Sequence, residues 1–340
     1  MIDLIIAGGG PAGLATGLCA ARAGLSCVIV EPHRAPIDKA CGEGLMPGAV
    51  RALAHLGLDV TGQPLRGIRY VCGSDTVTAS FSSGDGRGIA RTQLHAALSV
   101  AAQEAGVEFR RAHIEELQQG TEDVRVDGLR ARYLVGADGL HSRVRHVAGL
   151  QREVRRSPRR WGIRAHLRLA PWTDHVEVHW GRTGEAYVTP LAPDLVGVAV
   201  LSGQRMSFAD HVKDLPALRE RLAGVPLAAP PRGAGPLRQD AISRVRGRVL
   251  LVGDAAGYVD ALTGEGLAIA FSSAVALVER VIGGDVLRYE FDYRRISRRY
   301  RLITAALLQA AQRPSLRRHI VPAACRYPVL FQAAVDQLAR

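Results

Sequence analysis

Residues 3–31 read DLIIAGGGPAGLATGLCAARAGLSCVIVE, and this stretch decides the fold. An apolar strand leads into a glycine-rich turn, a helix of small residues follows, and a second apolar strand ends at the acid Glu31. This spacing presents helix N–H groups to a dinucleotide pyrophosphate, and an acid at the second strand's end accepts hydrogen bonds from a ribose. The turn residues that we expect to face the pyrophosphate are Gly8, Gly10, Pro11, Ala12 and Gly13. The stretch leaves NAD and FAD both open.

The composition indicates a globular chain with a large core. It has 340 residues, of which 47% are hydrophobic, and this length suggests roughly two domains. No apolar run reaches the ~18 residues that span a bilayer. The five cysteines are odd in number and scattered, without a Cys-x-x-Cys pair. We therefore expect a cytoplasmic protein with neither a disulfide framework nor a metal site.

The formal net charge is +12, and it comes almost entirely from arginine, since Lys39 and Lys213 are the only lysines. Such a skew is typical of codon bias, and only 5% of residues are aromatic, so we expect no nucleic-acid partner. The late arginines alternate with apolar helix, which favours a solvated helix face and leaves peripheral membrane contact as an open alternative. These arginines are Arg294, Arg295, Arg298, Arg299, Arg301, Arg313, Arg317 and Arg318.

Strand and helix patterns divide the chain into a discontinuous nucleotide-binding domain, an insertion and a helical end. Four period-two segments within 161–201 predict an antiparallel sheet, and residues 66–81 predict a hairpin. A helix is predicted over 207–222 and a Pro/Gly-rich connector over 224–236. The predicted ranges are 1–65, 84–158 and 237–285 for the nucleotide-binding domain, 66–83 and 159–236 for the substrate domain, and 286–340 for the C-terminal helices. The predicted fold class is α/β, a Rossmann-like domain with an inserted antiparallel-sheet domain.

Two further motifs end an apolar strand in an aspartate. Residues 133–145 read YLVGADGLHSRVR, and residues 249–267 read VLLVGDAAGYVDALTGEGL. They place Asp138 and the Gly253-Asp254 pair at the carboxyl edge of a parallel sheet, where ligands of open α/β sheets bind. A carboxylate there can accept hydrogen bonds from a sugar-alcohol chain. Taken singly, Asp138 also fits a strand-ending turn and Asp254 a helix cap.

With these three motifs in this order, nearly the whole chain resembles the class A flavoprotein monooxygenases of the p-hydroxybenzoate hydroxylase fold and the related geranylgeranyl-reductase-like flavoproteins. The resemblance implies bound FAD, with its pyrophosphate on the glycine turn, Glu31 on the adenosine ribose and Asp254 on the ribityl chain. It also implies that Asp138 serves both FAD and a transient NADH or NADPH. Arg91 would lie near the flavin, and Arg34 follows Glu31 as in the family. The backbone implied to face the isoalloxazine is that of Gly264, Glu265, Gly266 and Leu267.

The chain departs from the common family pattern at two positions. Gly257 and Ala261 stand where the family commonly has a histidine and a proline, and the Thr-Gly-Glu-Gly run is closer to the reductase-like branch. Cys41 lies in a glycine loop where some reductase relatives carry a Cys-x-Gly; a small buried cysteine is the alternative reading. The inserted sheet offers further candidate catalytic side chains, for which a structural role is the alternative. They are His166, His179 and Tyr187.

Three functions stay open at this point. The leading hypothesis is an NAD(P)H-consuming monooxygenase that hydroxylates an aromatic or polyketide-like small molecule of secondary metabolism. The second is a flavin-dependent reductase of isoprenoid double bonds in a lipid, and the third is a flavin-binding protein without turnover. Turnover without oxygen separates the first two. The Trp-x-Trp-x-Ile-Pro signature of tryptophan halogenases is absent, so we expect no halogenation. The oligomeric state is left open.

Overall fold

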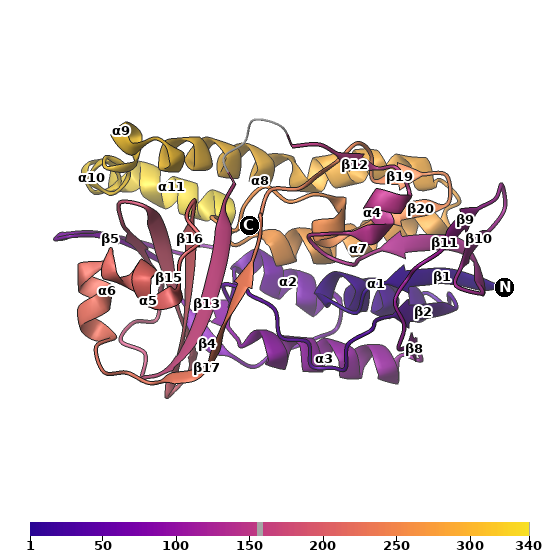
Figure 1. Cartoon of the computed structure of the whole chain (residues 1–340), viewed down its shortest axis with the longest axis horizontal. Coiled ribbons are helices and arrows are strands. Elements are labelled where there is room, and N and C mark those ends of the chain that lie inside the picture. Colours follow the sequence, from indigo (N-terminus) through magenta and orange to yellow (C-terminus); the bar gives the residue numbers. More distant parts are fainter. Residues whose placement is uncertain (155–158, 340) are drawn as a thin grey trace.

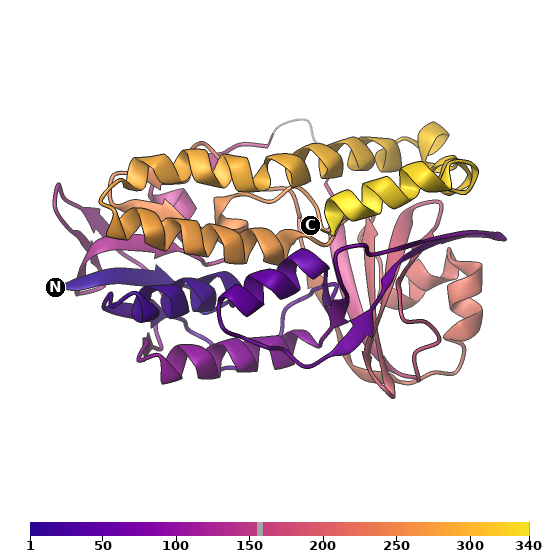
Figure 2. The same cartoon turned by 180° about the vertical axis from the view of Figure 1, so that it is seen from behind.

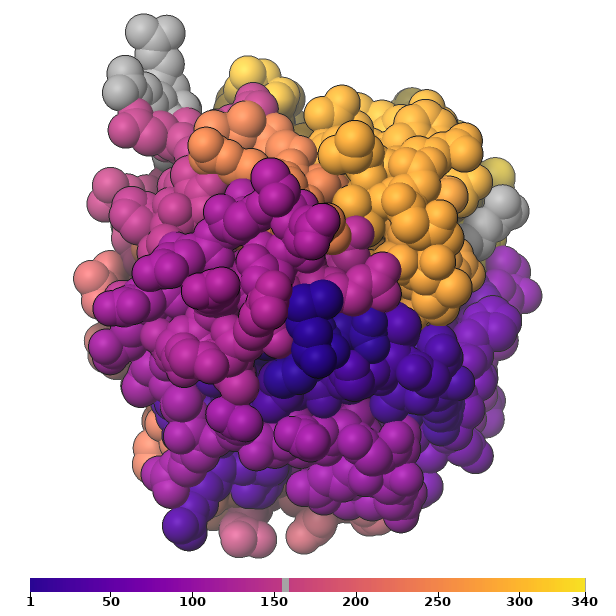
Figure 3. Space-filling model, turned by 90° about the vertical axis from the view of Figure 1, so that its right-hand side faces the viewer, coloured from indigo at the N-terminus to yellow at the C-terminus, as the bar shows by residue number. Residues whose placement is uncertain are grey.

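The computed structural model describes residues 1–154 and 159–339. Two large sheets lie at opposite ends of an elongated molecule, and long helices run along them (Figure 1). The N-terminus lies at the end of the first sheet, and Figure 3 shows this end, where the first strand, in indigo, emerges between magenta and orange segments. Among the described residues, no helix combines the length and the apolarity needed to cross a membrane.

The first sheet is a mainly parallel sheet, as the opening stretch predicts. Its main strands are β1 (Ile2–Ala7), β2 (Cys27–Val30), β8 (Glu108–Arg110), β11 (Leu129–Gly136), β19 (Val245–Arg246) and β20 (Val249–Leu251). The order is β19–β20–β11–β1–β2–β8, and all neighbours except β19 and β20 are parallel. Leu4, Ile6 and Leu134 are fully buried, as the near-continuous apolar strands of a parallel sheet are expected to be. A hairpin of β9 (Leu117–Gln119) and β10 (Val124–Val126) pairs with β11.

The helices that pack on this sheet begin at the nucleotide-binding motifs. They are α1 (Pro11–Arg22), α3 (Arg91–Glu104) and α7 (Gly266–Ile282), and α1 contacts both of the others. A short α4 (Arg143–Val147) follows β11, and a 3₁₀ turn, η1 (Gly253–Ala256), follows β20. The helix of the third motif begins at Gly266. The Rossmann-like architecture of the prediction is confirmed.

The second sheet gathers the four predicted period-two segments and the predicted hairpin. Its strands are β5 (Gly67–Cys72), β6 (Asp75–Ser80), β13 (Trp161–Arg168), β14 (Val176–Trp180), β15 (Gly184–Ala192), β16 (Leu195–Ser202) and β17 (Leu227–Ala234). The order is β17–β13–β16–β15–β14–β5–β6. The four predicted segments pair antiparallel, as expected, whereas β5 of the hairpin runs parallel to β14, so the sheet as a whole is mixed. The two strands come from distant segments of the chain, so no tight hairpin forces them to be antiparallel.

Two local predictions are corrected by proline chemistry. The single helix expected over 207–222 is split into α5 (Phe208–Lys213) and α6 (Pro216–Arg221), because the residue before a proline is disfavoured in the helical region. The connector expected over 224–236 contains β17, which pairs with β13 despite Pro230 and Pro231. As the edge strand of the sheet, β17 tolerates residues that lack an N–H donor.

Two smaller strand pairings lie outside the two large sheets. One has three strands, β3 (Gly44–Leu45), β4 (Gln63–Leu65) and β7 (Gly86–Gly88), and the other pairs β12 (Gln151–Arg152) with β18 (Asp240–Ala241). Helix α2 (Pro47–His55) follows β3 and contacts α7. The exact domain ranges stay a prediction, and the predicted boundary at residue 158 lies outside the described residues.

The end of the chain is helical, as predicted. After a 3₁₀ turn, η2 (Val286–Arg288), it forms α8 (Tyr289–Gln312), α9 (Pro314–Arg317), α10 (Ile320–Arg326) and α11 (Pro328–Leu338). Helix α8 lies along α7, and α10 and α11 return onto β6 of the second sheet (Figure 2). The C-terminal helices therefore connect the two ends of the molecule.

A buried arginine ties α4 to the turn after β20. The guanidinium of Arg145 donates to the carbonyls of Leu140 (2.9 Å) and Ala255 (2.9 Å), and to the Gln151 side chain (2.7 Å). Only 1% of Arg145 is exposed. This side chain thus joins the second and third motifs of the sequence.

We predict that Arg145→Met lowers the free energy of unfolding by about 3 kcal/mol, because several buried acceptors lose their donor. Arg143→Met is the matched control, since Arg143 is exposed on the same helix, and we expect a change below about 0.5 kcal/mol. Urea denaturation of both variants measures the difference. Equal stability of the two variants would contradict this role for Arg145.

Candidate functional site

The glycines of the first turn serve two different purposes. A Cβ on Gly13 would lie 1.9 Å from the Gly8 carbonyl oxygen, and a Cβ on Gly8, whose φ is +104°, would lie 2.5 Å from the Ala137 carbonyl oxygen. Gly13 is thus required by the close packing of α1 on the turn, and Gly8 by the close approach of the turn to the backbone after β11. A Cβ on Gly10 would meet only the Arg91 side chain, at 3.9 Å. The space beside Gly10 is therefore open, as close approach of a phosphate requires.

Arg91 is positioned beside this turn by a buried carboxylate. The Arg91 backbone N–H, at the start of α3, donates to Glu43 Oε1 at 2.8 Å, so Glu43 acts as the helix cap from 48 positions away. Arg91 is only 9% exposed, and its Nε has no hydrogen-bond partner among the described residues. His95, one turn further on, hydrogen-bonds the Gly9 carbonyl at 2.8 Å. A buried cation without a full set of partners at a glycine turn fits a diphosphate.

Glu31 lies at the end of β2, as predicted, and is held in place. Its Oε2 accepts from the Gly9 N–H at 2.8 Å, and its Oε1 pairs with His33 at 2.7 Å. Burial raises the pKa of the Glu31 carboxyl, but the hydrogen bonds from Gly9 and His33 outweigh burial, so the net shift is downward. Glu31 is thus a carboxylate acceptor at neutral pH. Arg34 is exposed, and its predicted cofactor contact stays a prediction.

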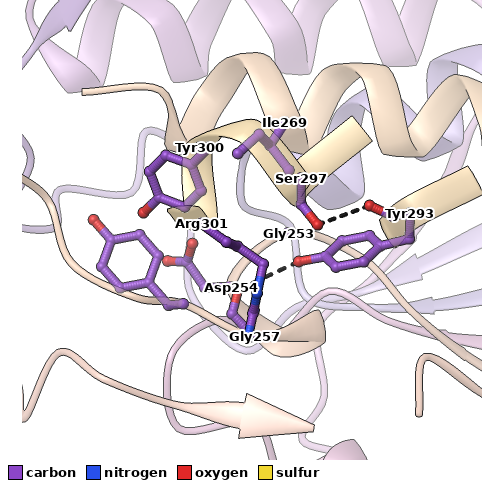
Figure 4. A pocket seen from close by; sticks show the side chains of 10 residues that line it. Gly253, Asp254, Gly257, Ile269, Tyr293, Ser297, Tyr300 and Arg301 are labelled. Carbon is purple, nitrogen blue, oxygen red and sulfur yellow. Dashed lines mark hydrogen bonds between the residues drawn. The ribbon is translucent and has the colours of Figure 1, made fainter. Parts of the chain in front are cut away.

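Asp254 sits in η1, directly after β20. Burial raises the pKa of its carboxyl, while the positive charges of Arg91, Lys39 and Arg145 act in the opposite direction. Three cations from separate elements therefore act on one carboxylate between the first and third motifs. Behind it, a small cavity reaches Tyr293, Tyr300 and Arg301 of α8 (Figure 4). This cavity has room for roughly one water molecule.

The Thr-Gly-Glu-Gly run forms the turn that enters α7. Gly264 has φ +72°, Glu265 is the N-cap residue, and Gly266 begins the helix. The N-terminal N–H groups of α7 and its positive dipole end are thereby available to an electron-rich ring. Burial raises the pKa of the Glu265 carboxyl to about 8, although the charge of Arg299 lowers it. Glu265 is therefore protonated at neutral pH, and its Oε2 has no partner among the described residues.

A polar cluster joins the loop after β2 to the second sheet. His166 Nε2 on β13 lies 2.6 Å from Glu43 Oε2, and Arg164 on the same strand pairs with Asp38. The Arg164 Nε is 3.8 Å from the same Glu43 oxygen. Cys41 Sγ accepts from the Glu43 N–H at 3.4 Å, so the thiol lies within this cluster. Two of the predicted catalytic residues, Cys41 and His166, are thus brought together through Glu43.

Tyr187 and His179 lie on opposite faces of the second sheet. Tyr187 shares the Arg164 face, because both residues pair with Ala199, and its hydroxyl donates to the Leu262 carbonyl at 2.9 Å. Burial raises the pKa of Tyr187 well above its ordinary value. His179 points the other way and lies 2.7 Å from Glu177.

Helices α5 and α6 cover the face of the second sheet that carries His179, so this face is turned away from the nucleotide-binding motifs. Its register neighbours are Ala186 and Val200, which belong to the apolar cluster that includes Phe208 and Leu218. We therefore withdraw His179 from the catalytic candidates. The alternation of residues along β14 does not say which of its two faces lines the site. The helices that cover each face of the sheet decide it.

The Asp138 carboxylate is engaged in local structure. It accepts from the Ser142 hydroxyl and, at 3.0 Å, from the Val144 N–H, and so stabilises the start of α4. This is the strand-ending turn that the sequence left as the alternative. A role for Asp138 toward NADH or NADPH stays a prediction.

The residues present fit FAD. Four features between the first and third motifs suit this cofactor. They are the open side of Gly10, the unpartnered Nε of Arg91, the Glu31 carboxylate and the Asp254 carboxylate. A metal site is not indicated, because no group of three or more His, Cys, Asp or Glu side chains within 1–154 and 159–339 is arranged to hold an ion.

Comparison with known proteins decides the family. A family model described as an FAD binding domain matches residues 1–214. The chain belongs to this FAD-binding family. It lies within the superfamily of class A flavoprotein monooxygenases and their relatives, which is a superfamily of FAD-binding oxidoreductases.

Relatives of this flavoprotein include reductases and hydroxylases. It is 28% identical over 331 residues to a menaquinone reductase of Mycobacterium tuberculosis, covering 84% of this chain and 78% of that protein. It is 30% identical over 307 residues to digeranylgeranylglycerophospholipid reductase 1 of Methanopyrus kandleri, covering 78% and 76%. A 3-(3-hydroxy-phenyl)propionate/3-hydroxycinnamic acid hydroxylase of Mycobacterium sp. strain JLS is 28% identical over 305 residues, covering 78% of this chain and 51% of that protein.

Solved structures support the fold. The structure of a myxobacterial chondrochloren halogenase superposes with a TM-score of 0.81 at 20% identity, covering 100% of this chain and 91% of that one. At this identity the similarity concerns the fold alone. The predicted arrangement of a Rossmann-like FAD domain with an inserted sheet and C-terminal helices is confirmed.

The sequence reasoning missed two residues of the site. Glu43 was given no role, although it stands two residues after the predicted Cys41, and His95 was not considered. The sequence does carry a signal for Glu43, a charged residue inside a glycine loop at a nucleotide motif. Its partners Arg91 and His166 are 48 and 123 residues away, so no local pattern connects them.

We predict that Gly10→Ala preserves the fold but weakens FAD binding by at least about tenfold, because its methyl group would occupy the phosphate space. The Gly10 φ of −72° suits alanine, so the free energy of unfolding of the apoprotein should change by less than about 0.5 kcal/mol. Gly13→Ala is the contrasting variant, since its Cβ would clash with the Gly8 carbonyl and destabilise the fold itself. FAD titration and thermal unfolding separate the two effects, and unchanged FAD affinity in Gly10→Ala would refute the assignment.

We predict that Glu265 makes the apoprotein less stable as the pH rises from about 5 to 8. The folded state holds this proton up to a pKa of about 8, whereas the unfolded chain releases it near 4.5. The native state therefore binds more protons in this window, and the free energy of unfolding falls by up to about 1.4 kcal/mol per pH unit. Glu265→Gln should remove this slope, and Glu279→Gln, on the exposed side of α7, should keep it. Urea denaturation between pH 5 and 8 tests this, and parallel curves for wild type and Glu265→Gln would contradict it.

Proposed function

We propose that the protein is an FAD-dependent reductase that saturates a carbon–carbon double bond of an isoprenoid substrate, with NADH or NADPH as the electron donor. The observation that carries this proposal is the position of Cys41. Its thiol lies half-buried in the loop after β2, beside Glu43 and within reach of the charges of Arg91 and Arg164. This order of hypotheses reverses the one drawn from the sequence.

The proposed reaction needs a proton donor. FAD, when bound and reduced, supplies the hydride equivalent for one carbon of the double bond, and the other carbon needs a proton. Burial raises the pKa of the Cys41 thiol, which keeps the proton on sulfur at neutral pH. The charges of Arg91 and Arg164 act in the opposite direction and would stabilise the thiolate left after proton transfer. A solvent proton then restores the thiol.

The surroundings of the α7 entry suit a hydrocarbon. Met46, Val176 and Leu262 belong to one buried apolar cluster. The Met46 Cε lies 3.4 Å from where a Cβ on Gly264 would be, so apolar side chains border the backbone proposed to face the isoalloxazine. The two reductases above are also matched over about three quarters of their own length, against about half for the hydroxylase.

Hydroxylation of an aromatic substrate is the second candidate. Tyr187 and His166 lie on the same face of the second sheet, where they could hydrogen-bond a phenol. The match to the hydroxylase supports this candidate.

Mass analysis of the product in the presence and absence of oxygen tests the proposal. The enzyme loaded with FAD is incubated with NADH or NADPH and either a geranylgeranyl lipid or menaquinone. We expect a gain of two hydrogens under argon. A gain of one oxygen that requires air would establish the hydroxylase instead, and failure of both nucleotides to bleach the flavin would favour a protein without turnover.

We predict that Cys41→Ser lowers the rate of double-bond reduction by about 100-fold, because serine is a far weaker acid at this position. FAD content should not change, since the hydroxyl keeps the size of the side chain. Cys72→Ser is the matched control, because Cys72 lies on β5, away from the polar cluster. Equal rates for the two variants would remove Cys41 from the mechanism.

A further inference from the structure

The C-terminal part of the chain has an extreme charge pattern. Between Tyr293 and Val335 the sequence contains nine arginines and no aspartate or glutamate. This segment thus carries most of the excess positive charge of the chain, whose formal net charge is +12. Four of these arginines pair with acidic residues outside the run, namely Arg294, Arg295, Arg301 and Arg317. Arg313, Arg318 and Arg326 form no ion pair with a described residue, so these three charges are available to an anionic partner.

The same segment exposes large apolar side chains at one end of the molecule. Figures 1 and 2 both place α9, α10 and the start of α11 at the end opposite the N-terminus. Val329 is 78% exposed and Leu330 67%, next to Tyr327 at 53%, and Leu316 on α9 is 44% exposed. We call these four residues, with the exposed Arg313, Arg318 and Arg326, the C-terminal tip.

The tip is rigidly anchored from its inner side. Val321 and Phe331 are buried in the apolar cluster of the second sheet, and Phe331 contacts the Tyr70 ring at a centroid distance of 4.7 Å. The buried Arg317 donates to Glu185 Oε2 at 2.8 Å and lies over the Trp180 ring. The inner side thus holds the outer apolar residues in place rather than burying them.

The positive charge of the C-terminal tip favours an anionic binding partner over a second copy of the chain. A second copy bound through the same patch would bring like charges together, since a two-fold contact pairs each patch with itself. A bilayer with anionic headgroups offers phosphates to the arginines, an interface to Tyr327, and an apolar boundary to Val329 and Leu330.

We propose that the C-terminal tip binds the surface of an anionic membrane. The proposal goes beyond the reductase function and does not depend on it, because surface binding needs neither substrate nor turnover. It also places the apolar cluster at the membrane side, since the cluster extends from Val321 and Phe331 to Met46 and Leu262 at the site.

Vesicle flotation of the FAD-loaded protein tests the proposal. We expect binding to vesicles of phosphatidylcholine and phosphatidylglycerol (about 7:3) and little binding to pure phosphatidylcholine, with most of the difference lost in 0.5 M NaCl, because salt screens surface charges. Each of Arg318→Gln and Arg326→Gln should lower the partition coefficient about fivefold. Equal binding to both kinds of vesicle would overturn the proposal.

A paired variant separates membrane binding from folding. Val329→Glu with Leu330→Glu should lower binding at least about tenfold, while bound FAD and the unfolding temperature stay unchanged. Ile242→Glu is the control, because Ile242 is 51% exposed and lies three residues before β19, which Figure 1 shows at the end of the molecule away from α9 and α10. Binding by the paired variant equal to that of the control would refute the proposal, as would a dimer that this variant abolishes.

Discussion

One buried carboxylate, that of Glu43, connects the parts of the site. It caps α3 through the Arg91 N–H, pairs with His166 and lies beside Arg164, and only 3% of the residue is exposed. Its φ of +60° places a non-glycine residue in the left-handed region, which is uncommon outside functional loops. Because a buried charge is stable only when it is paired, the positions of the loop, of α3 and of β13 are fixed together.

A second set of buried ion pairs fixes the C-terminal helices to the inserted sheet. Glu185 of β15 pairs with Arg160 and with Arg317 of α9, and Arg160 also approaches Asp260 at 3.3 Å. Burial raises the pKa of Asp260 to about 6, although the charge of Arg160 lowers it. Such networks contribute little net stability relative to apolar packing, but they disfavour alternative arrangements in which a charge would lie unpaired. The position of the second sheet relative to the C-terminal helices thus depends on specific ion pairs and not on buried apolar area alone.

The parts of the fold that the sequence predicts are those with local physical rules. The glycine turn, the apolar parallel strands and the α7 entry follow from spacing within a few residues, and the structure places them as expected. The faces of β14 could not be assigned, because alternation does not say which side α5 and α6 will cover. The strand β17 was hidden by Pro230 and Pro231, which only an edge position tolerates. Glu43 was hidden because all its partners are distant in sequence.

The central claim is that Arg91, positioned by Glu43, holds the pyrophosphate of FAD at the Gly10 side of the turn. Calorimetric titration of the apoprotein and of Arg91→Gln with FAD, ADP and riboflavin tests it most directly. The account predicts that the variant binds FAD and ADP about 10- to 100-fold more weakly, as expected for lost charge-assisted hydrogen bonds, while riboflavin binding is unchanged. Unchanged affinity for ADP and FAD in Arg91→Gln would contradict the account.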